Sequence, residues 1–221
     1  KVRRRKSVDE RLENRFWTSM YRLGYSMLNS GRAFKILVSK RGEPALYKQV
    51  DVFAKDDETV IVAECKACET RRRRNLQKDM NEFIALKGAM ASSIKKYFGD
   101  NFKPKIIWFF VTENIIWSST DLERARQNSI QVMREQEYRY FSQIIDHLGS
   151  AARPQFLAEY LSGSAVPGLE NVTTPAIRGK LGPHKFYAFV ATPEQLLKIA
   201  FVNHRALRVR LRKGIPLEAG S

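Results

Sequence analysis

Hydrophobic residues in this chain form two strand-length runs that are apolar on both faces. Residues 60–63 read VIVA and residues 105–112 read KIIWFFVT, a pattern typical of strands buried between helices. The first run belongs to a β-rich segment from Thr59 to Lys66, which follows another from Leu46 to Ala54. Because the polar Lys55-Asp56-Asp57-Glu58 segment separates the two, the pattern predicts an antiparallel hairpin.

A helical period of apolar residues marks the segments around these strands. Ser7 is the expected N-cap of a helix that ends at Gly24, with Glu10 placed to complete a capping box. A helix over 71–98 is expected to connect the two buried strands in parallel. Shorter predicted elements are strands at 34–38 and 130–133, and helices at 121–128 (capped by Ser119 or Thr120), 135–148 and 152–161. The order predicts an α/β fold with a central mixed β-sheet flanked by helices.

The composition changes after Gly149. Residues 162–183 are rich in Gly, Ser, Pro and Thr and predict a linker, followed by a strand at 185–192 and a helix that runs from Pro193 to His204. A segment of about fifty residues is too short to bury a full core alone. The sequence therefore predicts one domain over 1–162, and a linker with a partial C-terminal α+β segment over 163–221.

Two acidic residues and a lysine are expected to meet in the hairpin. Side chains alternate along a strand, so Val62, Glu64 and Lys66 share one face. A hairpin centred between Asp56 and Asp57 would place Asp51 opposite Val62 and diagonal to Glu64, about 7–8 Å away at the backbone. Two carboxylates at that separation can bind a divalent cation between them.

These residues resemble the PD-(D/E)XK nuclease superfamily, whose fold is the restriction-endonuclease-like core. Asp51 precedes the Glu64-Cys65-Lys66 triplet by thirteen positions, although Val50 stands where the usual proline would be. The resemblance implies that Asp51, Glu64 and the main-chain carbonyl of Cys65 bind Mg²⁺, for which Mn²⁺ substitutes. It also implies that Lys66 orients and helps to deprotonate the attacking water, and that it stabilises charge developing on the phosphate.

A fourth acidic residue comes from the first helix. Glu13 precedes Phe16, Trp17 and Met20 at helical spacing, so it lies at the edge of the buried face. From the helix alone, Glu13 is a surface glutamate whose stem covers apolar groups. The resemblance implies instead that Glu13 completes the catalytic metal site, with Glu10 as the reserve candidate.

A basic cluster follows the triplet. Arg71, Arg72, Arg73 and Arg74 precede Gln77 and Lys78, and all are expected at the leading end of the 71–98 helix. Such a run is either a solvated face or a binding site for nucleic-acid phosphates. Gln77 resembles the glutamine that some nuclease families place on this helix, although Asn81 stands where their tyrosine would be.

Charge and cysteine content narrow the class of protein. The 221 residues include 39 basic and 23 acidic side chains, a formal net charge of +16 that favours DNA as the partner. The sequence contains no transmembrane run, signal peptide, Walker-type loop or dinucleotide fingerprint. The Cys65/Cys68 pair has CxxC spacing but lacks the second pair that a zinc site needs, and two isolated cysteines indicate a reducing, cytoplasmic compartment.

Both ends suggest a longer polypeptide. The chain opens on KVRRRK without an initiator methionine. Residues 179–205 resemble the entry to the DGQHR or DndB-like domain that is associated with DNA phosphorothioation, although the Asp-Gly-Gln-His-Arg motif itself does not occur. This resemblance implies a role in DNA modification, restriction or defence.

The leading hypothesis is a Mg²⁺-dependent DNA endonuclease, similar to Mrr-like restriction nucleases and archaeal Holliday-junction resolvases. The presence of all four ionisable groups favours it. The alternative is a non-catalytic DNA-binding or transcription-regulating module of a phosphorothioation system. A homodimer is one arrangement that the resemblance implies, because many relatives cut both strands as dimers.

Overall fold

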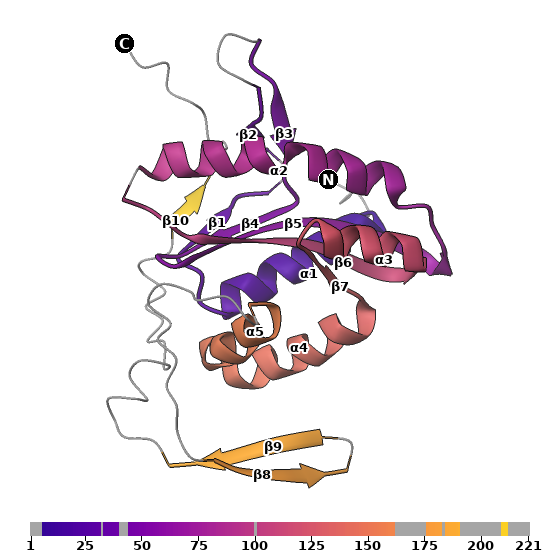
Figure 1. The fold of residues 1–221 in the computed structure, drawn as a ribbon, viewed down its shortest axis with the longest axis vertical. Helices are drawn as coiled ribbons and strands as arrows, with labels where there is room; N and C mark the ends of the chain where they lie inside the picture. Colours follow the sequence, from indigo (N-terminus) through magenta and orange to yellow (C-terminus); the bar gives the residue numbers. More distant parts are fainter. Residues whose placement is uncertain are drawn as a thin grey trace, which may run out of the picture.

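The computed structural model describes residues 6–31, 33–39, 44–99, 101–161, 176–182, 184–190 and 209–211. At its centre is a six-stranded sheet in the order β10-β1-β4-β5-β6-β7, with helices on both faces (Figure 1). β4 is antiparallel to β5, whereas β5, β6 and β7 run parallel, so the sheet is mixed. The predicted fold class, α/β with a central mixed sheet flanked by helices, is confirmed.

The elements have the following bounds. The helices are α1 (Val8–Arg22), α2 (Gln77–Phe98), α3 (Ser119–Gln127), α4 (Glu135–Leu148) and α5 (Arg153–Tyr160), with a 3-10 turn at Gly149–Ala152. The central sheet contains β1 (Met27–Asn29), β4 (Val52–Lys55), β5 (Thr59–Arg73), β6 (Lys105–Ile116), β7 (Ile130–Met133) and β10 (Val209–Leu211). Two separate sheets pair β2 (Lys35–Leu37) with β3 (Tyr47–Gln49), and β8 (Ala176–Leu181) with β9 (His184–Phe189).

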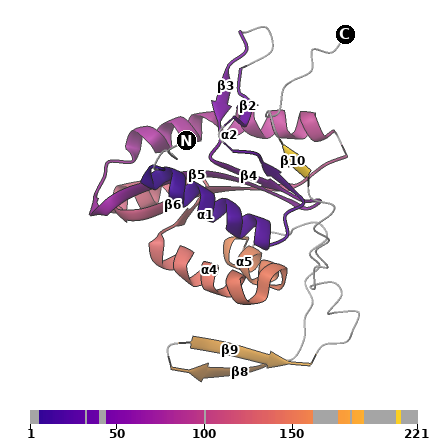
Figure 2. The ribbon, with the colours of Figure 1, turned by 180° about the vertical axis from the view of Figure 1, so that it is seen from behind.

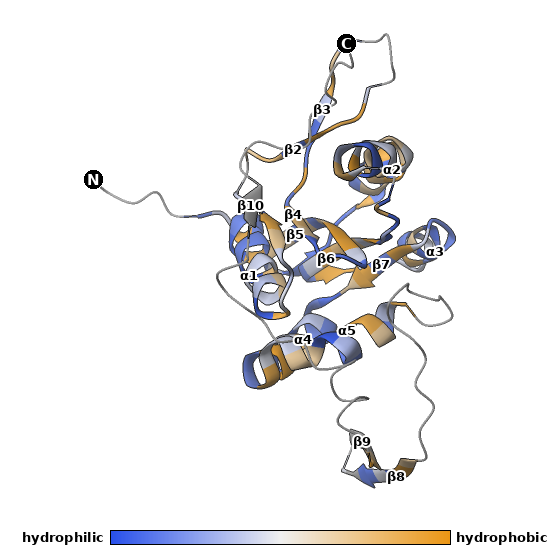
Figure 3. Ribbon diagram, turned by 90° about the vertical axis from the view of Figure 1, so that its left-hand side faces the viewer, coloured by the Kyte–Doolittle hydropathy of each residue, from blue (hydrophilic) through white to orange (hydrophobic). Residues whose placement is uncertain are grey.

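Two hydrophobic layers enclose the central sheet. α1, α4 and α5 cover one face and α2 and α3 the other, which leaves the apolar strands in the middle (Figures 2 and 3). Along β5, Ile61 and Ala63 face the α1 layer, whereas Val60 and Val62 face the α2 layer. All four are fully buried, so the prediction of a strand covered on both sides is confirmed.

The first helix follows its predicted capping. The Ser7 hydroxyl accepts from Glu10 N at 3.2 Å, and Ser7 N donates to the Glu10 carboxylate at 2.7 Å. This satisfies donors that the first turn of a helix leaves without partners. Gly24 follows the helix with φ +94°, a conformation that glycine adopts without strain.

The segment from Leu46 to Ala54 is two strands rather than the single one predicted. β3 pairs with β2, and β4 enters the central sheet, with a bend between them at Asp51. The 34–38 strand therefore lies outside the central sheet, where β1, which the pattern missed, is the neighbour of β4. Asn29 of β1 stabilises the break, because its side chain accepts from Phe53 N at 3.0 Å and donates to Asp51 O at 3.1 Å.

The hairpin register also differs from the prediction. Val52 pairs with Ala63 and Lys55 pairs with Val60, so one further step sets Asp51 opposite Glu64 instead of Val62. The turn closes one residue later than expected because Asp56 Oδ1 accepts from the backbone N–H groups of Glu58 and Thr59, at 2.8 and 2.7 Å. The shift in pairing is an even number of residues and preserves the faces of the paired strands, whereas Asp51 itself lies at a bend outside the ladder.

The strand β5 is longer than predicted, and this moves the arginine cluster. β5 continues beside β6 as far as Arg73, with an irregular step between Ala67 and Arg72. Arg71, Arg72 and Arg73 therefore lie on the strand rather than on a helix, and α2 begins only at Gln77. β5 and β6 run parallel with α2 between them in sequence, so the predicted crossover is confirmed.

The predicted cap of α3 and the predicted linker need correction, and the predicted 193–204 helix concerns residues that the structure does not describe. Ser118, not Ser119 or Thr120, caps α3 by accepting from Asp121 N at 3.0 Å. β8 lies within the segment that was predicted to be a linker. Gly179 of β8 pairs with Phe186 of β9, and the Phe186 ring occupies the space that a side chain at position 179 would need. Residues 162–175 and the predicted 193–204 helix lie outside the described residues, and none of the described helices is long and apolar enough to cross a membrane.

Candidate active site

Asp51 lies at the bend that precedes β4, directly beside the middle of β5. Its Oδ2 accepts a hydrogen bond from Cys65 N at 2.8 Å, and its main-chain oxygen accepts from the Asn29 amide at 3.1 Å. β5 therefore holds the carboxylate of Asp51, and β1 holds its main chain. The bend aims it at the β5 triplet, as the sequence predicted.

Glu64 and Lys66 lie two residues apart on β5 and form an ion pair. Lys66 Nζ is 2.7 Å from Glu64 Oε1, and the two side chains are only 18% and 12% exposed. Because solvent is largely excluded, this contact is stronger than an exposed pair would be. The structure thus brings Asp51, Glu64 and Lys66 together.

The negative charges of Asp51 and Glu64 lie close enough to repel each other. The pKa of Asp51 rises from its ordinary value of 3.8 to about 7, first because burial disfavours the charged form and then because Glu64 and Glu13 are negative. The Cys65 N–H and Lys66 lower this pKa but do not reverse the shift. A divalent cation would stabilise the ionised pair, since opposite charge favours the deprotonated form of both.

Lys66 is a cation in this arrangement. Burial lowers its pKa, but the charge and hydrogen bond of Glu64, followed by Asp51 and Asp79, outweigh burial and raise the pKa above 10.5. The ammonium group therefore keeps its proton at neutral pH. In this geometry Lys66 can stabilise negative charge on a phosphate.

Glu13 and Asp51 line one cleft of about 420 Å³ between α1 and the β1 end, together with Asn29. Glu10 also lines this cleft, but its carboxylate accepts from Ser7 N in the capping box. The structure therefore brings Glu13 into the cleft of Asp51, where its charge raises the pKa of Asp51, but not into a three-carboxylate group with Glu64.

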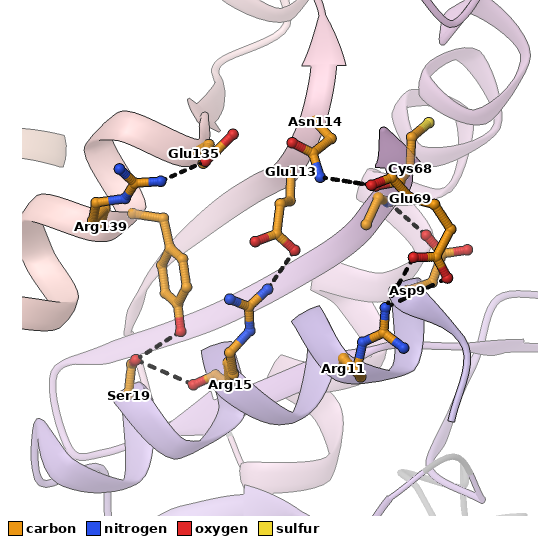
Figure 4. A network of polar contacts seen from close by, with 12 residues as sticks. Asp9, Arg11, Arg15, Ser19, Cys68, Glu69, Glu113, Asn114, Glu135 and Arg139 are labelled. Atoms are coloured by element: carbon orange, nitrogen blue, oxygen red, sulfur yellow. Dashed lines mark hydrogen bonds and ion pairs between the residues drawn. The ribbon is translucent and has the colours of Figure 1, made fainter. Parts of the chain in front are cut away.

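Ion pairs hold α1 against the strand ends beside this site. Arg11 Nη2 lies 3.3 Å from Glu69 Oε2 of β5, and Arg15 pairs with Glu113 of β6 (Figure 4). Asn114 of β6 donates to Cys68 O at 3.0 Å and joins the two strands. These contacts fix the helix turn from which Glu13 projects.

Two aspartates near the triplet were not predicted. Asp79 lies in the first turn of α2, with Oδ1 4.0 Å from Lys66 Nζ and Oδ2 3.7 Å from Arg74 Nη2. Asp9 of α1 accepts from Ala67 N at 2.5 Å, where β5 becomes irregular. The sequence shows an acidic residue in the first turn of each helix, but only the fold shows that both turns contact β5.

The predicted phosphate-binding residues divide into two groups. Arg73, Arg74 and Gln77 line a cleft of about 620 Å³ at the end of β5. Arg71, Arg72 and Lys78 are exposed and do not line it. A single basic face over all six residues is therefore not observed, and alternation along β5 turns Arg72 away from Arg71 and Arg73.

The two cysteines belong to opposite layers of the molecule. Cys65 packs in the α1 layer and Cys68 in the α2 layer, and both are free thiols. Burial, followed by the charges of Asp51 and Glu13, raises the pKa of Cys65 well above the ordinary thiol value. The CxxC spacing thus does not form a redox pair, and only the main chain of Cys65 is suited to metal binding.

The carboxylate oxygens of Asp51 and Glu64 suit Mg²⁺, which commonly takes few ligands from the protein. Across the described ranges, no group of three or more His, Cys, Asp and Glu side chains is arranged to hold a metal ion. Mg²⁺ is commonly held by one or two carboxylates together with waters and substrate phosphates. Asp51 and Glu64 supply two partly buried carboxylates, which is the hard oxygen chemistry that this ion prefers.

Comparisons with known proteins are sparse. No protein-family model and no curated protein sequence matches the chain. Protein VC1899 from Vibrio cholerae is similar over 62% of the chain, at 12% identity and a TM-score of 0.43. Can2 from Sulfobacillus thermosulfidooxidans, solved in complex with cyclic tetra-adenylate, is similar over 61%, at 15% identity and a TM-score of 0.40. The chain spans 33% and 34% of these two proteins, and likeness at this level carries no conclusion about function.

Proposed function

We propose that this chain is a metal-dependent endonuclease of the PD-(D/E)XK type that hydrolyses phosphodiester bonds in DNA. The observation that carries the proposal is the partly buried pair of carboxylates, Asp51 and Glu64, beside the Lys66 ammonium. Two carboxylates beside one ammonium group favour the binding of a divalent cation together with a phosphate. Neither the cation nor the phosphate alone would neutralise the charge of this site.

The residues divide into ligands and a phosphate-binding group. Asp51, Glu64 and the carbonyl of Cys65 would hold Mg²⁺ or Mn²⁺, with Glu13 assisting directly or through water. The bound cation would polarise the phosphoryl oxygen and lower the pKa of a water molecule. Lys66 would stabilise the charge that develops on the phosphate, because it keeps its proton and lies against Glu64.

DNA is the proposed substrate because of the charge of the whole chain. The net charge of +16 favours a polyanion, and arginines gather at the end of β5, close to Lys66 in sequence. The resemblance of residues 179–205 to a DndB-like domain supports a place in DNA modification, restriction or defence, as part of a longer polypeptide. A homodimer would allow both strands to be cut.

A non-catalytic module that binds DNA or regulates transcription is the second candidate. The observation in its favour is the Lys66–Glu64 contact, which already neutralises one carboxylate without a metal. In that case the acidic pair would be structural and the arginines alone would bind DNA.

Cleavage of supercoiled plasmid separates the two candidates. Wild type, Asp51→Asn and Lys66→Met are incubated with Mg²⁺, Mn²⁺ or EDTA, with Asp57→Asn and Lys103→Met as controls for loss of an exposed charge of the same kind. We expect metal-dependent nicking that both site variants lose by at least about 100-fold and both controls retain. Unchanged DNA binding without cleavage of plain, modified or branched DNA would leave the binding module as the better account.

A further inference from the structure

A second cleft opens at the end of β5, on the side of α2 and α3. Arg73, Arg74 and Gln77 form one wall, and Ser119, Thr120 and Arg124 of α3 form the other, around a volume of about 620 Å³. The site described above uses none of the α3 residues. The two walls are about forty residues apart in sequence, and the parallel pairing of β5 with β6 brings them together.

The charge of this cleft is positive. The Arg73 side chain is exposed, and within the described ranges its guanidinium has no ion-pair partner. Arg124 pairs with the buried Asp121 at 2.7 Å, and Arg74 lies 3.7 Å from Asp79. Each of these two arginines thus neutralises an aspartate, and Arg73 is left as uncompensated charge at the mouth of the cleft.

The start of α3 adds donors to the same wall. Ser119 and Thr120 occupy the first two helical positions, with exposed hydroxyl side chains. Backbone N–H groups at these positions have no partner within a helix, and the helix dipole makes them favourable to anions. Arginines and helix donors therefore face one space.

A chain of ion pairs links the cleft to the candidate active site. Arg74 lines the cleft and contacts Asp79, which in turn lies 4.0 Å from Lys66 Nζ. One charged side chain therefore separates the cleft from the lysine of the triplet. The cleft is therefore a neighbour of the triplet at the same end of β5.

We propose that this cleft binds the sugar–phosphate backbone of the nucleic acid beside the bond that is cut, without reading its bases. The inference rests on the proposed function and adds the α3 wall to it. Trp117, the aromatic residue here, donates its indole N–H to Thr112 at 2.8 Å and packs edge-on against Phe110, so its ring is committed to the fold. Phosphate contacts of this kind position a strand without specifying sequence.

Two substitutions test the cleft by removing or opposing its charge. Arg73→Gln removes the uncompensated cation, with Arg126→Gln on the exposed side of α3 as its control. Ser119→Glu places a negative charge at the first position of α3, where it stabilises the helix but repels phosphate. Its control is Gln136→Glu, an exposed position in the first turn of α4 that makes the same charge change outside the cleft.

Binding is measured by fluorescence anisotropy with labelled DNA duplexes of unrelated sequence, in EDTA, across a series of salt concentrations. We expect both cleft variants to lose affinity on the order of threefold to tenfold for every duplex, and Arg73→Gln to lower the salt slope by about 1. Both controls keep wild-type affinity within about twofold, and thermal unfolding shows that Ser119→Glu is at least as stable as wild type.

The outcomes separate this inference from the proposed function. Cleft variants that bind no worse than their controls would overturn the α3 wall, whether or not the protein cuts DNA. Loss of binding in the cleft variants alone would support it even if wild type cleaves nothing. A wild-type protein that binds no duplex at low salt would overturn it as well.

Discussion

At the scale of single residues, the candidate site holds negative charges close together in a partly buried position. Asp51 accepts a backbone hydrogen bond that favours its ionised form, yet burial and the charge of Glu64 act more strongly and raise its pKa to about 7. The folded protein therefore holds a proton on Asp51 that the unfolded chain releases near pH 3.8. This difference makes stability depend on pH.

We predict that Asp51→Asn flattens the decline in stability between about pH 4 and pH 7. In wild type the unfolded state binds fewer protons than the folded state over that window, so stability falls as pH rises through it. Asparagine carries no such charge and can still accept the hydrogen bond from Cys65 N. Urea unfolding at pH 5 and pH 8 should show that wild type loses more stability than the variant, by an amount on the order of 1–4 kcal/mol. Parallel profiles for the two proteins would contradict the shift.

We predict that Cys65→Ala keeps metal-dependent cleavage within a few-fold of wild type. The proposed ligand at this position is the main-chain carbonyl, and burial raises the pKa of the thiol far above the range in which it reacts. Plasmid nicking and thermal unfolding of the variant check this. A folded variant without activity would show that the sulfur takes part.

At the scale of elements, the hairpin and the β6 strand beside it could be predicted, whereas β1 and the ends of the strands could not. The apolar run at 60–63 and the alternation through Lys66 were enough to place Glu64 and Lys66 on one face. The register depended on Asp56, whose side chain closes the turn through two backbone N–H groups. The length of β5 depended on its pairing with β6, so the sequence placed Arg71 to Arg73 on the wrong element.

A buried ion pair joins the hairpin turn to the C-terminal end of the core. Arg153, at the start of α5, pairs with Asp56, and their side chains are 3% and 5% exposed. Arg153 also lies over the Tyr25 ring, 4.9 Å from its centroid. Because Asp56 closes the β4–β5 turn as well, the pair links the site's hairpin to the α5 layer.

We predict that Arg153→Ala lowers the free energy of unfolding by about 3–5 kcal/mol, because it leaves a buried aspartate without its cation. Arg22→Ala is the control, since Arg22 pairs with Asp146 at an exposed site where the two side chains are 50% and 55% exposed. That change should cost at most about 1 kcal/mol. Urea unfolding of both variants checks the difference, and equal losses would contradict it.

At the scale of the whole molecule, the sheet brings together residues that no local pattern connects. α1 packs on one face of the central sheet and brings Glu13 to the cleft that Asp51 lines. α2 covers the other face and brings Asp79 close to Lys66. The sequence could propose Glu13 only by resemblance. It gave no sign that the start of α3 would face the arginines of β5, since that follows from parallel pairing of β5 and β6.

The most direct test of this account is whether Asp51 binds a divalent cation. Electron paramagnetic resonance counts free Mn²⁺ during a titration of the protein at pH 8, above the pKa of Asp51. Asp51→Asn is compared with wild type, and Asp57→Asn, at the exposed turn, is the control for loss of a carboxylate. We predict that wild type and Asp57→Asn remove Mn²⁺ from solution with the same affinity and that Asp51→Asn binds at least about tenfold more weakly. Equal Mn²⁺ binding by all three proteins, or none by wild type, would contradict a metal site at the Asp51–Glu64 pair.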